Sequence, residues 1–276
     1  MDDRLDFTDR FLSVPAARIG VFDSGVGGLS VLRALHSRLP DASMTYIGDV
    51  SHAPYGDRTA SDIVDRSALL VEHLAAQGAQ VIVIACNTAT VLAIETLRAR
   101  WPRLAFVGVE PGVKPAVTRS RSRRIAVMTT AATASSDRLR HLIARHAEDA
   151  HVHVQPCPML ASAIERGVLG GPALRDLLQP YCDEIIAADV DTVVLGCTHY
   201  PFVDDAIRAL LGAEIVLIDT ATAIAERTAS LWERVPPGFD VAPTVQVCST
   251  GARDTMQLLL GRCAGLENLE VRPLAL

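Results

Sequence analysis

Short runs of β-branched and other apolar residues alternate with helical patterns along this chain. Strands that alternate with helices predict parallel sheets flanked by helices, and continuous apolar runs fit sheets buried on both faces. We expect strands at 17–23, 44–49, 80–86, 104–109, 124–130, 152–157, 192–197, 214–219, 244–249 and 269–274. We expect helices at 27–38, 60–77, 88–100, 135–147, 172–188, 202–211, 221–234 and 252–263.

The same order of elements occurs twice in the chain. Three pairs of segments resemble each other at nearly the same separation: 19–35 with 125–142, 46–56 with 152–162, and 81–90 with 193–202. The alternative is that any α/β chain contains similar strand–turn–helix units. A length of 276 residues suits one large or two medium domains, and the repeat favours two.

We therefore expect an α/β fold of two pseudo-symmetric domains, with mainly parallel sheets flanked by helices and an active site in the cleft between the domains. The strand at 244–249 would rejoin the first domain. The expected parts are 17–112 plus 219–276 for the first domain, 113–218 for the second, 1–16 as an N-terminal extension, and chain crossings near 110–116 and 218–220.

Composition excludes several classes of protein. Hydrophobic residues make up 49% of the chain and charged residues 21%, which excludes a disordered chain. No apolar run approaches the ~18 residues that cross a bilayer, so we expect no membrane partner. The N-terminal segment MDDRLDFTDR is acidic where a secretory signal would be basic, so we expect a cytoplasmic protein.

The charge and the basic residues also argue against other partners and cofactors. The net charge is −6 and aromatic residues are 4%, which does not suit a nucleic-acid-binding protein. Lys114 is the only lysine, and pyridoxal chemistry needs a Schiff-base lysine. His151 and His153 alternate on one strand and fit a solvated edge better than a metal site. We expect neither a cofactor nor a metal.

The chain has six cysteines and no C-x-x-C motif. A reducing cytosol disfavours disulfides, and most free cysteines are small buried apolar residues. We assign Cys157, Cys182, Cys248 and Cys263 to packing.

Cys86 is an exception because it lies in ACNT, where a buried strand meets a helix start. Asn87 and Thr88 suit a helix N-terminus, whose dipole lowers the pKa of a nearby thiol. A thiolate at pH 7 costs about 2 kcal/mol, and the dipole supplies roughly 0.3–1 kcal/mol. The dipole alone therefore does not activate Cys86.

Cys197 lies in GCTHYP, at the matching place in the second half. Thr198 follows it, and His199 could tune the thiol or move a proton. Ligands of parallel sheets bind at the carboxyl ends of the strands, so the repeat predicts one thiol per domain at a shared cleft. The alternative is two buried cysteines at strand ends.

Three further segments contain candidate binding groups. FDSGVGG (22–28) matches neither a dinucleotide fingerprint nor a P-loop, but Asp23 could accept from an ammonium group and Ser24 could donate to a carboxylate. GDVSHAPYG could close over a ligand with the Tyr55 hydroxyl and the Gly56 N–H, whereas a plain turn or loop is the simpler alternative for both segments. Glu165 could face the cleft or the solvent.

These segments together resemble the glutamate racemases of the cofactor-independent aspartate/glutamate racemase superfamily. The matching stretches, in family order across roughly residues 18–220, are FDSGVGGLSVLR, YIGD…PYGDRT, ACNTAT, GVEPGVKPAV, QPCPML and LGCTHYP. This family has two pseudo-symmetric α/β domains with the substrate between them. The chain departs from the family in its N-terminal extension and in GDVSHAPYG, where GDTA is usual. It also has ERG at 165–167, where the family pattern is EEG.

The resemblance implies that Cys86 and Cys197 are acid/bases on opposite faces of the substrate Cα, with Cys86 serving D-glutamate and Cys197 serving L-glutamate. Asp23, Glu165 and His199 match assisting residues. The positions that match substrate-binding residues are Asp23, Ser24, Tyr55, Gly56, Asn87, Thr88, Thr198 and His199, and Thr130 is added for its hydroxyl.

We therefore expect a glutamate racemase, acting as a homodimer and supplying D-glutamate for peptidoglycan. Three alternatives remain open from the residues: a related racemase of aspartate or another acid, a non-catalytic amino-acid-binding protein, and a cysteine hydrolase in which only one thiol is indispensable.

Overall fold

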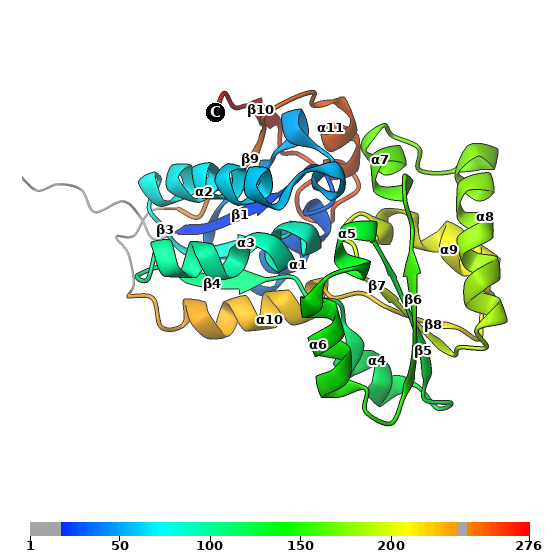
Figure 1. Ribbon diagram of the computed structural model, residues 1–276. Helices are drawn as coiled ribbons and strands as arrows, with labels where there is room; N and C mark the ends of the chain where they lie inside the picture. The colour runs from blue at the N-terminus through cyan, green and yellow to red at the C-terminus, as the bar shows by residue number, and fades with distance from the viewer. Residues whose placement is uncertain (1–17, 237–241) are drawn as a thin grey trace, which may run out of the picture.

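The chain forms two parallel β-sheets, each covered by helices (Figure 1). This computed structural model describes residues 18–236 and 242–276, so the predicted extension 1–16 lies outside the described residues. The six-stranded sheet has the order β10-β9-β2-β1-β3-β4, and the four-stranded sheet has the order β6-β5-β7-β8. The strands are β1 (Arg18–Asp23), β2 (Ser43–Gly48), β3 (Ala79–Ile84), β4 (Ala105–Gly108), β5 (Arg124–Thr129), β6 (His151–Pro156), β7 (Thr192–Leu195), β8 (Val216–Ile218), β9 (Val245–Ser249) and β10 (Val271–Pro273).

Eleven α-helices and three short 3-10 helices connect these strands in the described part of the chain. The α-helices are α1 (Leu29–Arg38), α2 (Ala60–Ala76), α3 (Asn87–Arg100), α4 (Val113–Arg119), α5 (Ala131–Ala134), α6 (Asp137–His146), α7 (Leu160–Glu165), α8 (Gly171–Ala187), α9 (Asp204–Leu211), α10 (Ala221–Trp232) and α11 (Asp254–Leu260). The 3-10 helices are η1 (Val50–His52), η2 (Tyr55–Asp57) and η3 (Tyr200–Val203).

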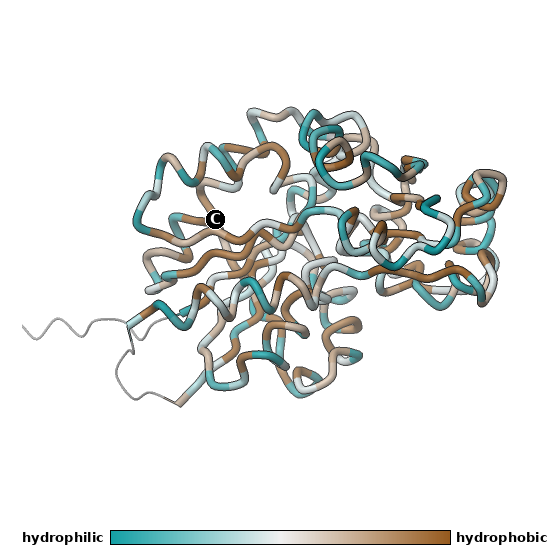
Figure 2. Tube along the Cα trace, turned by 90° about the horizontal axis from the view of Figure 1, so that it is seen from below, coloured by the Kyte–Doolittle hydropathy of each residue, from teal (hydrophilic) through white to brown (hydrophobic). Residues whose placement is uncertain are grey.

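The first sheet is buried on both faces, as its continuous apolar runs predict. Successive side chains of a strand point to opposite faces. In β1, Val21 packs into a cluster with residues of α1 and α10, whereas Phe22 packs into another cluster with residues of α2 and α3. In Figure 2 the apolar segments lie along the strands inside the molecule.

The second sheet also packs helices against both of its faces, and its core is continuous with the core of the first sheet. Val127 of β5 packs with α4 and α6, and Met128 packs with α8 and α9. The cluster that contains Met128 also contains Val21 of β1, so one apolar cluster spans both sheets. This shared core fixes the carboxyl ends of the two sheets relative to each other.

The structure departs from the sequence prediction in its short helices. The sequence pattern missed α4, α5 and α7, because four to seven residues show too little of a 3.6-residue period. Helix α4 begins at Val113, inside the segment expected to be a plain crossing. Its Pro115 stands in the first turn, where a missing N–H is tolerated.

The predicted return of the chain to the first sheet is confirmed, because β9 pairs with β2. Cys157, Cys182 and Cys263 are buried, but Cys248 on β9 is only half-buried, which corrects its assignment to the interior. All six thiols are free. Within residues 18–236 and 242–276, no helix is long and apolar enough to span a membrane, and no cluster of side chains suits a metal ion.

Candidate active site

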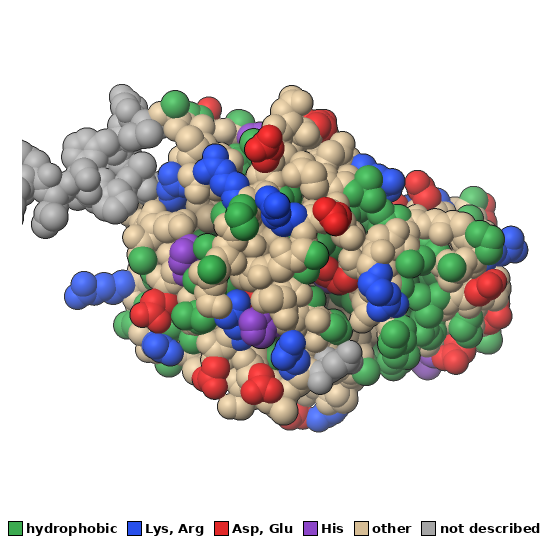
Figure 3. Space-filling model, turned by 90° about the horizontal axis from the view of Figure 1, so that it is seen from above, with side chains coloured by type: hydrophobic (Ala, Val, Ile, Leu, Met, Phe, Trp, Pro, Cys, Tyr) green, Lys and Arg blue, Asp and Glu red, His purple; other side chains and the backbone are tan. Residues whose placement is uncertain are grey.

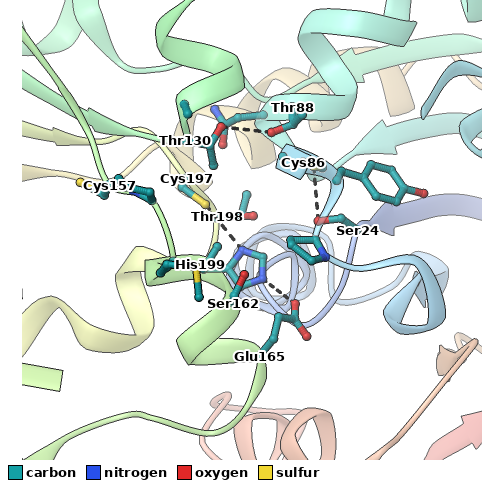
Figure 4. Close-up of a pocket in the computed structure, with 18 residues that line it drawn as sticks. Ser24, Cys86, Thr88, Thr130, Cys157, Ser162, Glu165, Cys197, Thr198 and His199 are labelled. Carbon is teal, nitrogen blue, oxygen red and sulfur yellow. Dashed lines mark hydrogen bonds and ion pairs between the residues drawn. The ribbon is translucent and has the colours of Figure 1, made fainter. Parts of the chain in front are cut away.

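Cys86 and Cys197 line one cavity of about 110 Å³ at the carboxyl ends of the two sheets. Cys86 lies between β3 and α3, and Cys197 follows β7. In Figure 4 the two residues approach the pocket from different sides. The pocket is lined by Ser24, Pro54, Tyr55, Gly56, Cys86, Asn87, Thr88, Thr130, Ala131, Cys157, Pro158, Met159, Ala161, Ser162, Glu165, Cys197, Thr198 and His199.

The Cys86 thiol is buried at the N-terminus of α3. Its sulfur accepts from the N–H of Ala89 at 3.5 Å and donates to Ser24 Oγ at 3.6 Å. Burial and the nearby Asp23 carboxylate raise the pKa of the Cys86 thiol, and they outweigh the hydrogen bonds at the helix start. The hydrogen bond at the helix start does lower this pKa, as predicted, but burial decides the net direction and favours the neutral thiol at Cys86.

Cys197 has a different neighbourhood, formed by His199 and Glu165. The Cys197 sulfur lies 3.6 Å from His199 Nδ1, and His199 Nε2 lies 2.6 Å from Glu165 Oε1. Burial opposes the charged imidazole, but Cys197 and Glu165 outweigh it and raise the pKa of His199 well above its usual value. The structure therefore places an imidazole with a raised pKa directly against the Cys197 sulfur.

Glu165 also holds the loop that follows β1. Its Oε1 accepts from the N–H of Val26 at 2.8 Å. The same oxygen bonds His199, as Figure 4 shows, so one carboxylate oxygen joins this loop to His199. The structure therefore places Glu165 in the pocket wall, with the cleft-facing orientation that was one of its two alternatives.

Asp23 does not line the pocket, although it was predicted to contact the substrate. Its carboxylate is fully buried and accepts from the N–H groups of Gly28 at 2.8 Å and Gly25 at 3.3 Å. Burial raises its pKa, which His199 partly offsets. In this structure Asp23 orders the loop that carries Ser24, and its contact with the substrate stays a prediction.

Tyr55 lines the pocket, but its hydroxyl points to another partner. The hydroxyl donates to Asp49 Oδ2 at 2.7 Å, and the closure of this residue over a ligand stays a prediction. Gly56 lines the same wall, and an added Cβ there would approach only Thr130, at 3.9 Å. The wall formed by Tyr55 and Gly56 thus faces a residue of the second sheet.

The remaining predicted residues are brought together at the pocket. Thr88 Oγ1 and Thr130 Oγ1 lie 3.3 Å apart and join the two sides. Asn87 donates to the carbonyl of Val109 at 3.3 Å, and its buried Oδ1 has no hydrogen-bond partner among the described residues. Thr198 completes the polar lining.

The sequence interpretation missed Cys157, Met159 and Ser162 as pocket residues. The available signal was their place directly after β6, at the carboxyl end of a parallel strand. Met159 has a φ of 65° and is 58% exposed, so a large side chain in left-handed backbone stands at the pocket edge.

We predict that Gly25→Ala lowers kcat/KM about tenfold or more, because the reaction slows when a positioned group near the reacting atoms is displaced. An added Cβ at Gly25 would overlap Glu165 Oε1, which is fixed by Val26 and His199. Steady-state kinetics checks this, with Gly170→Ala as control, because a Cβ there meets nothing within 4 Å. Equal activity of the two variants would contradict the fixed position of Glu165.

Comparison with known proteins shows which family this chain belongs to. Residues 19–228 match the family model described as Asp/Glu/Hydantoin racemase. The chain is 48% identical to the glutamate racemase of Ectopseudomonas mendocina (strain ymp) over 211 residues, which cover 76% of this chain and 80% of that protein.

Two solved structures resemble the chain over 95% of its length. One is Escherichia coli glutamate racemase in complex with L-glutamate and the activator UDP-MurNAc-ala, with 29% identity, a TM-score of 0.83 and 99% of that chain covered. The other is glutamate racemase from Francisella tularensis subsp. tularensis SCHU S4 in complex with D-glutamate, with 25% identity, a TM-score of 0.80 and 98% covered. The α/β fold with parallel sheets and flanking helices is thereby confirmed.

Proposed function

Because this chain belongs to the Asp/Glu/Hydantoin racemase family and is a cofactor-independent isomerase, we propose that it interconverts L-glutamate and D-glutamate by proton transfer between Cα and two thiols, Cys86 and Cys197. The observation that carries this proposal is the position of the two sulfurs. They end strands of different sheets and line a single small cavity.

In the proposed reaction, a thiolate on one face accepts the Cα proton and becomes a thiol. The electron pair of the broken C–H bond stays on the substrate, delocalised toward its α-carboxylate. The thiol on the other face donates its proton to Cα and becomes a thiolate, so charge and protons balance. Two weak acids suit such a reversible transfer, and a closed site with fixed donors stabilises the developing charge.

The unequal surroundings of the two sulfurs set the resting state. A cationic imidazole, His199, lies against the Cys197 sulfur, and burial favours the neutral thiol at Cys86. With Cys197 serving L-glutamate, the resting enzyme is ready to convert the L to the D enantiomer. After one turnover the charges are exchanged, and the protons must re-equilibrate before the next L-glutamate reacts.

The polar side chains that line the pocket bind the amino acid. The buried, unpartnered Oδ1 of Asn87 is a suitable acceptor for the substrate ammonium group. Ser24 and Thr198, with the hydroxyl pair of Thr88 and Thr130, are donors for the carboxylates. Asp23 contributes indirectly, because its hydrogen bonds order the loop that carries Ser24.

The wider setting is part of the same proposal. The two domains comprise 17–112 plus 219–276 and 113–218, the enzyme works in the cytoplasm, and its D-glutamate enters peptidoglycan. It acts as a homodimer. Apolar side chains gather on one side of the face in Figure 3, which supports an association surface there. Sedimentation of the purified protein tests the dimer.

Deuterium exchange tests the substrate. Purified enzyme in deuterated water should place deuterium at Cα of glutamate and abolish the optical rotation of either enantiomer. Exchange into aspartate but not glutamate would make the protein a racemase of another acid. Tight binding of glutamate with no exchange would make it a binding protein, and would overturn the proposed activity.

A further inference from the structure

Asp49 is a buried carboxylate beside the pocket, but it is not one of the residues that line it. It follows β2 directly and is fully buried. Arg66 of α2 donates to both carboxylate oxygens, from Nε at 2.8 Å and from Nη2 at 2.8 Å. Tyr55 donates to Oδ2 at 2.7 Å, and Thr250 donates to Oδ1 at 2.8 Å.

These bonds keep the Asp49 carboxylate ionised. Burial alone would raise its pKa, but the hydrogen bonds from Arg66, Tyr55 and Thr250 outweigh burial and lower it. His52 also lies nearby, with Nδ1 at 3.4 Å from Oδ1. The carboxylate is therefore a fixed anion with partners on α2, in the 50–57 loop and after β9.

The loop 50–57 connects this anion to the pocket. At its far end, Tyr55 and Gly56 line the pocket while the Tyr55 hydroxyl is bonded to Asp49. At its near end, Ser51 bonds Thr250 through its N–H at 3.2 Å and its hydroxyl at 2.9 Å. Both ends of the loop thus converge on Asp49 and its partner Thr250.

We propose that Asp49 is a positioning residue, which holds the Tyr55–Gly56 wall in the place where it binds the substrate. This rests on the proposed racemisation of glutamate at the two thiols. The wall offers backbone N–H groups and a ring, and its hydroxyl is engaged, so it holds the substrate and transfers no proton. Its displacement weakens binding in the ground state and the transition state alike, which raises KM and leaves kcat nearly unchanged.

The most specific test removes only the hydrogen bond between the Tyr55 hydroxyl and Asp49. Tyr55→Phe keeps Asp49 paired with Arg66 and Thr250 and deletes a single hydrogen bond. We expect KM for both enantiomers to rise about threefold to tenfold, the size of a typical net hydrogen-bond contribution, while kcat stays within about twofold. An unchanged KM in Tyr55→Phe would overturn the positioning role.

Asp49→Asn tests the carboxylate itself and should raise KM about tenfold or more. The double variant Asp49→Asn/Tyr55→Phe should bind no worse than Asp49→Asn alone, because both changes break the same connection. Additive effects on KM, or a fall in kcat with KM unchanged, would contradict the proposal.

Asp191 provides a matched control for a merely structural carboxylate. It precedes β7, at the opposite end of the strand from Cys197, and accepts from Ser120 Oγ at 2.6 Å and from the N–H of Ser122 at 2.7 Å. Asp191→Asn should lower thermal stability without changing KM. An equal rise of KM in Asp191→Asn and Asp49→Asn would show a general loss of folding. If the unaltered enzyme does not exchange glutamate at all, the proposed function fails, which is a separate outcome.

Discussion

Cys86→Ala and Cys197→Ala should each lower kcat for glutamate racemisation about 10²- to 10⁴-fold, the usual contribution of a positioned acid or base. Each turnover uses one sulfur to accept a proton and the other to donate one, so neither thiol can replace the other. The measurement is the initial rate of optical rotation change in both directions, with thermal unfolding to show that the variants fold.

Two comparisons make this prediction sharper. Residues that act as a unit are not additive, so the double variant should be about as inactive as either single variant. Cys248→Ala is the control, because Cys248 is half-buried on β9 and does not line the pocket. Full activity in either Cys86→Ala or Cys197→Ala would exclude the two-thiol mechanism and favour chemistry at a single cysteine.

His199→Gln should have the next largest effect, lowering kcat/KM about 10²-fold at pH 7. His199 is the cationic partner of Cys197, and glutamine keeps a hydrogen-bonding group without the charge. Because L- and D-glutamate have equal free energy in water, kcat/KM must fall equally in both directions. Any difference between the directions appears in kcat and KM separately.

The pH profile distinguishes an electrostatic role of His199 from a structural one. The His199→Gln change removes a positive charge 3.6 Å from the reacting sulfur, so we expect the rise of kcat/KM to move to higher pH. His151→Gln, on the exposed edge strand β6, should leave the profile unchanged. An unshifted profile in His199→Gln would contradict the charge pairing.

The same residue links stability to pH. The pKa of His199 is raised in the folded state, so protonation of His199 stabilises the fold fully below its unfolded pKa of about 6.5. This contribution is lost as pH rises through the folded value. The difference in unfolding free energy between the unaltered enzyme and His199→Gln should therefore shrink as pH increases.

The sequence was sufficient for features that depend on local pattern. The β-branched runs located the strands, and the rule that parallel strands present ligands at their carboxyl ends placed Cys86 and Cys197 near one cavity. The return of the strand at 244–249 to the first domain was predicted because the segment after the repeat needs a place, and the structure gives β2 as its partner. Short helices such as α5 were missed because they have no measurable period.

The partners of polar groups could not be predicted in the same way. Sequence shows which groups Asp23 and Tyr55 offer, but burial decides that one bonds its own loop and the other bonds Asp49. From the sequence, Glu165 could equally face the cleft or the solvent. Its contacts with Val26 and His199, which lie far from it in the chain, decide for the cleft. The net rise in the pKa of Cys86 could not be predicted, because the helix start is visible in the sequence and the depth of burial is not.

The central claim is that the two sulfurs act on opposite faces of one carbon. It is tested most directly by starting from pure L-glutamate in deuterated water and stopping the reaction at low conversion. We predict that the D-glutamate formed carries deuterium at Cα while the recovered L-glutamate retains hydrogen, because the proton is removed by one thiol and returned by the other. Deuterium at equal levels in both enantiomers would show that one base serves both faces, and would contradict the account.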